Sequence, residues 1–334
     1  MTDQFVESDG QQKGTSGRVN QFALAGVAGY IAPKHLRAIR DTNSQLVAAL
    51  DPHDSVGILD SYFPEAKFFT EVERFDRFLE KHRRDQKAAI DYLSVCSPNY
   101  LHDAHVRLAL RAGCNAICEK PLVINPWNLD QLQELEQEYE TKVYNVLQLR
   151  LHPNVLRLQE DLQNSPPNTK HEICLSYITR RGRWYHRSWK GDEQKSGGVA
   201  TNIGIHFFDL LLSLFGSVER CVLNLDSQAR IAGTLDMERA RVRWFLSVDA
   251  NDLPQHVKAE GGHAYRSITV DGESLDLSAG FKELHTEVYR DILDGGGYGI
   301  ADARPSIELV YQLRQMKETT PSPLSHPFLI GEAY

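Results

Sequence analysis

The stretch NAICEKPL, residues 115–122, places a lysine at the exit of an apolar run. Charged amines are costly to remove from water, so Lys120 at the end of a predicted buried strand requires an explanation. Pro121 disfavours helical backbone angles for Lys120 and keeps it extended. Burial lowers the pKa of an amine, which can then accept a proton nearer neutral pH. The alternative is a lysine whose stem covers apolar surface while its ammonium pairs with Glu119.

A second polar pair lies in the apolar stretch SGGVATNIGIHFFD, residues 196–209. Asn202 and His206 are one helical turn apart among Ile, Phe and Leu, so both must meet polar partners or remain costly to bury. Asp209 could orient the His206 imidazole or face solvent. The preceding Ser-Gly-Gly gives a flexible entry where backbone can approach a ligand. A lone histidine in such a helix can equally be a satisfied core residue.

The segment ALAGVAGYIAPKH places glycines between the first predicted strand and a helix, where main-chain amides and the helix dipole can hold a pyrophosphate. The spacing Gly26-x-x-Gly29-x-x-Ala32 departs from G-x-G-x-x-G by one residue, and a tight turn would also explain the glycines. The next strand ends at Asp51, which either accepts from an adenosine ribose or is simply an exposed strand-end acid. No arginine that could bind the 2′-phosphate of NADP directly follows Asp51, which favours NAD as the cofactor.

The elements that would position these residues fall into two patterns. From Gln21 to about Arg150, strand and helix patterns alternate, which predicts a parallel sheet with crossover helices. The expected strands are 21–28, 45–51, 67–70, 90–98, 115–122 and 142–150. The expected helices are 33–42, 72–84, 100–113 and 125–140, the last with Asn125 as its cap and Pro126 at its first position.

After Arg150 the apolar residues alternate with period two, which predicts a mainly antiparallel sheet. The expected strands are 171–179, 219–226, 231–238, 239–248 and 266–277, and Asp271-Gly272 predicts a hairpin within the last. Helices are expected over 203–216, 281–293 and 304–318. The fold class is therefore α/β: an N-terminal doubly wound parallel sheet, followed by an α+β domain with a large, mainly antiparallel sheet.

Composition excludes several classes of partner. The net charge of −8 and the pI near 5.9 give no global attraction to nucleic acid or to an anionic membrane. FFDLLLSLFG is too short and interrupted to span a bilayer. Five cysteines without a C-x-x-C motif suggest reduced thiols and a cytoplasmic location. Residues 1–20 are polar and predict a flexible extension rather than a signal peptide. The expected domains are 21–141 and 142–334.

One loop contradicts the acidic average. RRGRWYHRSWKGD, residues 180–192, gathers four arginines and a lysine among Trp184, Tyr185 and Trp189. Guanidinium groups bind carboxylates and phosphates in a bidentate manner, and aromatic rings can stack on a sugar or a base. The loop therefore suits an anionic substrate, although a solvated basic loop or a subunit contact would give the same composition.

Four of these stretches together, over residues 26–32, 97–102, 118–122 and 196–209, resemble the glucose-fructose oxidoreductase and inositol dehydrogenase family. The resemblance covers about residues 21–315 and implies an NAD-binding Rossmann domain followed by an open-faced domain that binds substrate and forms oligomer contacts. It implies that Lys120 and His206 are catalytic and face the reacting hydroxyl. The family's usual aspartate four residues before that histidine is Asn202 here, which leaves it a hydrogen-bonding role.

The resemblance also assigns binding residues. No metal is expected, because His102 and His105 share a helix face without a set of partner ligands. Substrate contacts are expected from Lys120, Trp189, Asn202 and His206, with Asp192 in the same WKGD motif as Trp189. Cofactor contacts are expected from Gly26, Gly29, Tyr30, Ile31, Asp51, Ser97, Asn99, His102, Glu119 and Lys120.

Within the family, the stretches FALAGVAGYIAPKH, NPWNLD, WKGD and DARPSIE are most similar to the branch that oxidises UDP-N-acetyl-glucosaminuronic acid at carbon 3. This implies an NAD-dependent dehydrogenase whose 3-keto product feeds a diamino-uronic acid of a surface polysaccharide such as a lipopolysaccharide O antigen. A homodimer or homotetramer is implied as well. The alternatives are a dehydrogenase of another sugar or cyclitol, and a non-catalytic NAD-binding regulator.

Overall fold

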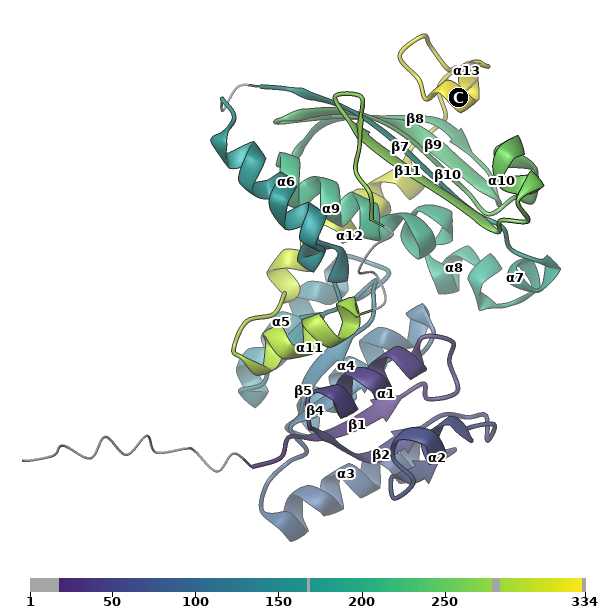
Figure 1. Cartoon of the computed structure of the whole chain (residues 1–334). Helices are drawn as coiled ribbons and strands as arrows, with labels where there is room; N and C mark the ends of the chain where they lie inside the picture. Colours follow the sequence, from purple (N-terminus) through teal and green to yellow (C-terminus); the bar gives the residue numbers. More distant parts are fainter. Residues whose placement is uncertain (1–17, 167–168, 278–282, 332–334) are drawn as a thin grey trace, which may run out of the picture.

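The computed structural model describes residues 18–166, 169–277 and 283–331. Up to residue 17, the predicted N-terminal extension lies outside the described residues, as do the first two residues of the helix expected over 281–293. The described chain forms two six-stranded sheets with helices (Figure 1).

The first sheet is parallel and has the strand order β3-β2-β1-β4-β5-β6. Its strands are β1 (Gln21–Ala25), β2 (Gln45–Leu50), β3 (Lys67–Phe69), β4 (Tyr92–Val95), β5 (Asn115–Cys118) and β6 (Val143–Asn145). Each expected strand is present but shorter than its apolar run, because the run continues into the loop beyond the carboxyl end of the strand. The order reverses between β1 and β4, where open α/β sheets place their ligands.

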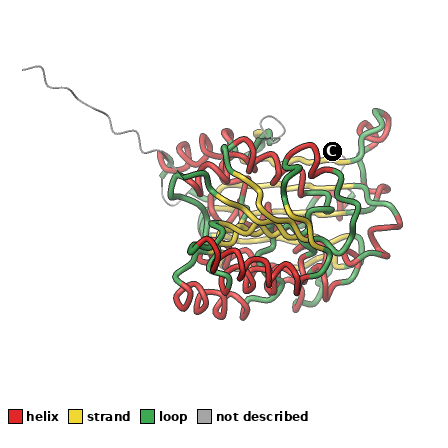
Figure 2. Tube along the Cα trace, turned by 90° about the horizontal axis from the view of Figure 1, so that it is seen from below, coloured by secondary structure: helices red, strands yellow, loops and turns green. Residues whose placement is uncertain are grey.

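Helices flank the strands of this sheet on both sides (Figure 2). They are α1 (Ala32–Asp41), α2 (Ile58–Tyr62), α3 (Val72–Gln86), the short 3-10 turn η1 (Asn99–Leu101) with α4 (His102–Arg111), and α5 (Trp127–Tyr139). The 3.6-residue apolar period located α1, α3, α4 and α5, and in α1 it buries Leu36 and Ile39. Pro126 precedes the first helical residue of α5, and the helix has no side-chain cap, so the expected Asn125 cap was wrong.

The second sheet has the order β12-β11-β7-β10-β9-β8 and is antiparallel except between β7 and β10. Its strands are β7 (His171–Thr179), β8 (Val218–Asp226), β9 (Arg230–Met237), β10 (Ala240–Ser247), β11 (Ala264–Val270) and β12 (Glu273–Ser274). The predicted hairpin joins β11 to β12, with positive φ at both Asp271 and Gly272. The α/β fold class with a mainly antiparallel second sheet is confirmed.

Most of the longer helices of this half lie on one face of that sheet, whereas the helix Leu284–Leu293 packs on α1 (Figure 1). The longer ones are α6 (Pro153–Asn164), α9 (Ile205–Phe215), α11 (Leu284–Leu293) and α12 (Ile300–Gln315). The shorter ones are η2 (Gln148–Leu151), α7 (Arg183–Arg187), η3 (Trp189–Gly191), α8 (Glu193–Ser196), the π-helical turn η4 (Ala200–Gly204), η5 (Ala250–Asp252), α10 (Gln255–Ala259) and α13 (Pro327–Ile330). Helix α6 was not predicted. Its start is marked by His152, whose side chain accepts from the Asn154 amide, and by Pro153 at the first helical position.

The most apolar helix, α9, is a core helix. A side chain at Gly204 would meet Leu246 of β10 at 2.5 Å, so glycine lets the helix lie close to the sheet, and Phe208 packs edge-on against Trp244. The helical run Glu193–Phe215 is 23 residues long and apolar enough to cross a membrane, which is longer than the sequence analysis expected. However, 72% of its window is buried inside the protein, as in a core helix.

A buried ion pair anchors α9. Asp209 is 2% exposed and accepts from Arg150 through both oxygens, at 2.7 and 3.0 Å, so it neither faces solvent nor pairs with His206, and both expectations for it were wrong. Burial raises the pKa of Asp209 to about 6, although the hydrogen bonds from Arg150 act in the opposite direction. The pair ties η2 to α9, and the segment between the two sheets thereby helps to hold the helix that carries His206.

Removing this carboxylate leaves a buried guanidinium without its partner. We expect Asp209→Ala to lower the free energy of unfolding by about 3–5 kcal/mol, measured by urea denaturation at pH 7.5. As a control, Glu80→Ala, which breaks exposed pairs on α3, should change it far less, because solvent screens exposed ion pairs. Equal effects of the two variants would contradict a stabilising role for the buried pair.

Candidate active site

Two clefts meet the carboxyl ends of the first sheet. The larger, about 950 Å³, lies beside the β1–α1 turn and is lined by Gly26, Gly29, Asp51, Ser97 and Trp189, among others. The smaller, about 330 Å³, lies between the two sheets. Its lining includes Tyr30, Ile31, Glu119, Lys120, Asn202 and His206. Of the predicted site residues, Asn99, His102 and Asp192 line neither cleft, and Asp192 caps α8 instead.

The larger cleft has the features of a dinucleotide site. Gly26 has a φ of +93°, and a Cβ there would lie 2.6 Å from the Cys96 carbonyl carbon and the Ser97 amide nitrogen. Only glycine therefore permits this turn to approach the end of β4. Asp51 is 6% exposed, so the alternative of an exposed acid was wrong. Its carboxylate accepts from the amides of Ala28 and His53 at 3.0 and 2.9 Å and so fixes the turn beside the cleft.

Asn99 and His102 have scaffold contacts. The Asn99 amide donates to the Ser196 carbonyl at 2.9 Å and so ties η1 to the loop before η4. The His102 ring nitrogens lie 2.6 and 2.8 Å from the carbonyls of Pro121 and Ser97, which links the loops after β4 and β5. Trp189 lines the larger cleft rather than the smaller one, with its ring edge-on to Tyr100.

The smaller cleft brings together Lys120 and His206, which are far apart in the sequence. The Lys120 Nζ donates to the Asn202 carbonyl at 3.1 Å, and the Asn202 amide donates to the Tyr185 hydroxyl at 2.8 Å. Asn202 lies on the π-helical turn η4, a feature that is frequent at functional sites and has no clear sequence signal. Among the described residues, the His206 ring has no hydrogen-bond partner and remains available to a ligand.

The pKa values of both Lys120 and His206 are lowered, which favours the neutral form of each side chain. Burial lowers the pKa of Lys120, and the Arg181 charge adds to this, while the charge of Glu119 opposes it. Burial, with the neighbouring Lys120 charge, holds the pKa of His206 well below its ordinary value. An amine with a depressed pKa beside a neutral imidazole is suited to taking a proton from an alcohol.

The smaller cleft is strongly cationic. Lys34, Lys120, Arg181 and Arg266 line it, and Glu119 is the only carboxylate among the described lining residues. Arg181 has no acidic partner in the described part of the chain, and Arg266 lies over the rings of Tyr177 and Phe207. Sequence reasoning placed Arg181 in the basic loop. It assigned no role to Lys34, although this residue lies in the quoted stretch ALAGVAGYIAPKH, or to Arg266 on β11.

Glu119 itself lies against two histidines that sequence reasoning missed. His35 on α1 and His285 on α11 both approach its carboxylate, and each one's Nε2 lies within hydrogen-bond distance of Oε1. The three could also hold a metal, because their ligand atoms all lie within 4.8 Å of one another. No sequence motif links residues so far apart in the chain.

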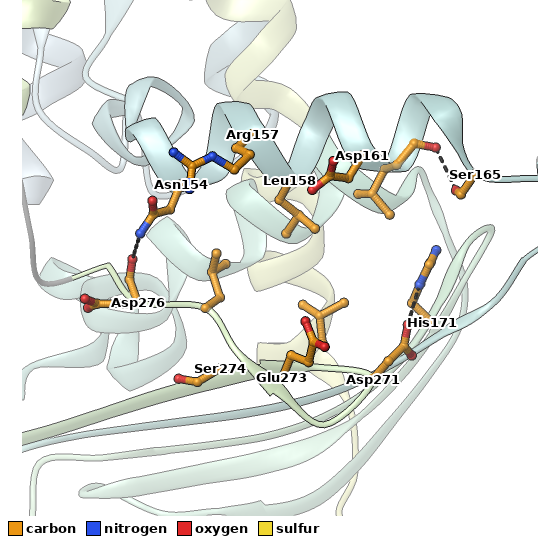
Figure 3. A pocket seen from close by; sticks show the side chains of 13 residues that line it. Asn154, Arg157, Leu158, Asp161, Ser165, His171, Asp271, Glu273, Ser274 and Asp276 are labelled. Carbon is orange, nitrogen blue, oxygen red and sulfur yellow. Dashed lines mark hydrogen bonds and ion pairs between the residues drawn. The ribbon is translucent and has the colours of Figure 1, made fainter.

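A third cavity, about 620 Å³, lies between α6 and the β11–β12 hairpin (Figure 3). Its polar groups pair with one another: the Asn154 amide donates to the Asp276 carbonyl at 2.7 Å, and the His171 Nδ1 lies 2.7 Å from the Asp271 carboxylate. It shares no lining residue with the two clefts and contains no predicted site residue. The chemistry therefore concentrates at the carboxyl edge of the first sheet.

Comparison with known proteins agrees with this architecture. Residues 20–146 match the oxidoreductase family's NAD-binding Rossmann-fold domain, and residues 171–245 match its C-terminal alpha/beta domain. The chain belongs to the glucose-fructose oxidoreductase and inositol dehydrogenase family. Family membership and an NAD-binding first domain, both expected from the sequence, are thereby confirmed.

Solved structures of this family include close relatives. The WlbA (WbpB) dehydrogenase of Thermus thermophilus is 50% identical, with a TM-score of 0.89 over 93% of this chain and all of that one. It has been solved with NAD and alpha-ketoglutarate and with NAD and UDP-GlcNAcA. The WlbA dehydrogenase of Bordetella pertussis is 16% identical with a TM-score of 0.74, over 92% of this chain and 98% of that one, and shows the shared fold alone.

Curated relatives in the family are more distant. The D-glucoside 3-dehydrogenase of Escherichia coli is 27% identical over 126 residues, which are 38% of this chain and 36% of that protein. Matches to the first three curated relatives span only 36%, 46% and 57% of their lengths.

The β1–α1 turn can be tested directly. We expect Gly26→Ala to abolish measurable NAD binding by calorimetry, because the new Cβ would displace the Cys96–Ser97 backbone. Gly57→Ala is the matched control, since a Cβ there meets nothing within 4 Å and φ is negative, and it should bind NAD as the parent does. A Gly26→Ala protein with unchanged affinity would show that this turn is not the dinucleotide site.

Proposed function

We propose that this protein catalyses the NAD-dependent oxidation of the 3-hydroxyl of UDP-N-acetyl-glucosaminuronic acid to the 3-keto sugar. The observation that carries the proposal is the smaller cleft, where Lys120 and His206 lie among further cations. A uronic acid joined to a nucleoside diphosphate brings both a carboxylate and a diphosphate, which such a cleft would bind. The Thermus thermophilus relative, which is 50% identical and has been solved with NAD and UDP-GlcNAcA, supports this substrate.

Each residue has a role in this scheme. When bound, NAD supplies the hydride acceptor that oxidation of a secondary alcohol requires. Gly26, Gly29 and Ser97 would hold its larger part, and Asp51 would face its ribose. Lys120 accepts the hydroxyl proton, because its lowered pKa lies closer to neutrality than that of a free lysine. Burial, with the neighbouring Lys120 charge, holds the pKa of His206 well below its ordinary value, and the neutral imidazole would hold the hydroxyl oxygen in place.

Asn202 and Trp189 complete the proposed substrate contacts. The Asn202 carbonyl fixes the Lys120 amine, and its amide is occupied by Tyr185, which agrees with a hydrogen-bonding role rather than a proton relay. Trp189 lies on the larger cleft, with the Lys190 ammonium 4.0 Å from its ring centre, and would contact substrate only at the boundary between the two clefts.

The wider setting is also proposed. The 3-keto sugar would enter the synthesis of a diamino-uronic acid for an O antigen, in the cytoplasm. The five cysteines, four of them buried, suit a reducing compartment. A homodimer or homotetramer is proposed from the family resemblance, and light scattering would measure it.

Loss of the amine tests the assignment of the base. We expect Lys120→Met to lower kcat at least a hundredfold, by removing the proton acceptor, while NAD still binds. The measurement is the absorbance of NADH at about 340 nm on mixing protein, NAD and the UDP-sugar. Near-parental turnover would remove Lys120 from the mechanism, and a parent protein without any signal would favour the NAD-binding regulator instead.

Arg181 tests the anionic substrate. We expect Arg181→Met to raise KM for UDP-GlcNAcA by about tenfold or more, since a hydrogen bond to a charged group contributes about 1.5–3 kcal/mol. Arg187→Met changes an exposed arginine of the same loop that lines neither cleft and is the matched control. If UDP does not inhibit the parent, a neutral sugar or cyclitol becomes the better substrate.

A further inference from the structure

A buried hydrogen-bonded chain lies directly beneath the smaller cleft. Glu119 is 6% exposed, and its Oε1 accepts from His35 Nε2 at 3.0 Å and from His285 Nε2 at 2.9 Å. Its other oxygen accepts from the main-chain amide of Lys120 at 3.2 Å. The same carboxylate therefore contacts two distant helices and the residue proposed as the base.

The chain continues beyond His35. The Tyr289 hydroxyl lies 2.8 Å from His35 Nδ1, and Ser94 Oγ lies 2.6 Å from the Tyr289 oxygen. Since a carboxylate only accepts, Nε2 of both histidines must carry a proton, and in a neutral His35 the Nδ1 then accepts from Tyr289. The tyrosine thus fixes the tautomer in which His35 donates to Glu119. Tyr289 and His285 are on one face of α11, one turn apart.

We propose that His35 and His285 are positioning residues for the reaction, which hold Glu119 as a carboxylate in one orientation and through it set the position and charge state of Lys120. This inference rests on the proposed function for its turnover readout, although the cluster itself does not. Lys120 is then fixed at both ends, its amide by Glu119 and its amine by the Asn202 carbonyl.

The electrostatics of the cluster agree with this role. Burial alone would raise the pKa of Glu119, but the hydrogen bonds from His285 and His35 outweigh it and hold the pKa well below its ordinary value. Burial lowers the pKa of His285, whose Nδ1 is buried without a partner among the described residues, so an added proton there would have no acceptor. The result is one permanent negative charge beside Lys120.

Other charged groups also act on this amine and on its carboxylate. Outside the cluster itself, the titratable side chains that interact with them are Lys34, Cys96, His102, Cys118, Arg181, Lys190, His206 and Arg266. Of the charges that act on Lys120, Glu119 is the only one that favours the ammonium form, and it does the same for His206. Neutralising Glu119 must therefore shift both groups in one direction.

A metal ion is a poorer account of the same three residues. Ligand bonds near 2.0–2.2 Å would place tetrahedral donor atoms roughly 3.3 Å apart, whereas both nitrogens lie at hydrogen-bond distance from Oε1. Metal-bound histidines almost always engage their second nitrogen, and that of His285 has no partner in the described chain. A divalent cation would also lie close to Lys34 and Lys120, which line the same cleft.

The effect of the Glu119 charge on Lys120 is tested by Glu119→Gln, which removes the charge but keeps the shape of the side chain and one acceptor oxygen. The readout that needs no substrate is the rate of Lys120 acetylation by acetic anhydride against pH, followed by peptide mass spectrometry, since only the neutral amine reacts. We expect the midpoint to move to lower pH by about one unit or more, and the acid limb of kcat/KM to move likewise. Glu136→Gln, a half-buried carboxyl that does not act on Lys120, should leave the midpoint unchanged.

The positioning role of the histidines is tested by a matched pair of His285 variants. His285→Gln can still donate an N–H toward Glu119, whereas His285→Leu cannot. We expect the leucine variant to lose about tenfold to a hundredfold in kcat and the glutamine variant to recover most of it, with melting temperatures recorded for both. Three results would each overturn the proposal. They are equal kcat in the two His285 variants, an unchanged midpoint of Lys120 acetylation in Glu119→Gln, and stoichiometric Zn²⁺ binding by the parent that is lost in His285→Leu. A shifted midpoint without any turnover of UDP-GlcNAcA would instead refute only the proposed substrate.

Discussion

The structure depends on the charge balance of one small cleft. Four cationic side chains and a single carboxylate line it, and the buried member of the set, the Glu119 carboxylate, would be costly without partners. Two histidine N–H groups and a main-chain amide satisfy the carboxylate. Cations outnumber carboxylates among the described lining residues, and Arg181 has no acidic partner in the described part of the chain, so the cleft is suited to an anion. The same excess, through Arg181, helps to lower the pKa of Lys120.

Maintaining that balance requires both halves of the chain. Lys120 follows a strand of the first sheet, and His206 lies on a helix packed against the second, so the cleft exists only while the halves stay together. Two contacts serve this purpose. The Arg150–Asp209 pair ties α9 to the segment that leaves the first sheet, and α11 returns across the molecule to pack on α1 (Figure 1). The return of α11 brings His285 beneath the active cleft and Tyr289 into the core of the first sheet.

These two contacts mark the limit of what the sequence predicts. The buried strands could be predicted because a parallel strand covered on both faces must be apolar throughout. The Gly-rich turn could be predicted because the main chain of one segment approaches that of another there and leaves no room for a side chain. Lys120 and His206 stand out because a polar residue in an apolar run is costly. His35 and His285 lie on ordinary amphipathic helices, where a buried histidine has the same pattern as an exposed one. Proximity along the helix suggested His206 as one possible partner of Asp209 and solvent as the alternative, but its partner Arg150 lies on another segment.

The position of the β1–α1 turn connects the two clefts. Gly29 lines the larger cleft and its neighbours Tyr30 and Ile31 line the smaller, so one short turn borders both. A ligand that occupies both clefts must cross this turn, passing from Asp51 at one end to Lys120 at the other. The absence of a side chain at Gly29 matters here as well, because a Cβ would lie 3.0 Å from the Gly26 carbonyl oxygen. An extended dinucleotide meets this requirement, whereas a compact ligand could fill either cleft without using the turn.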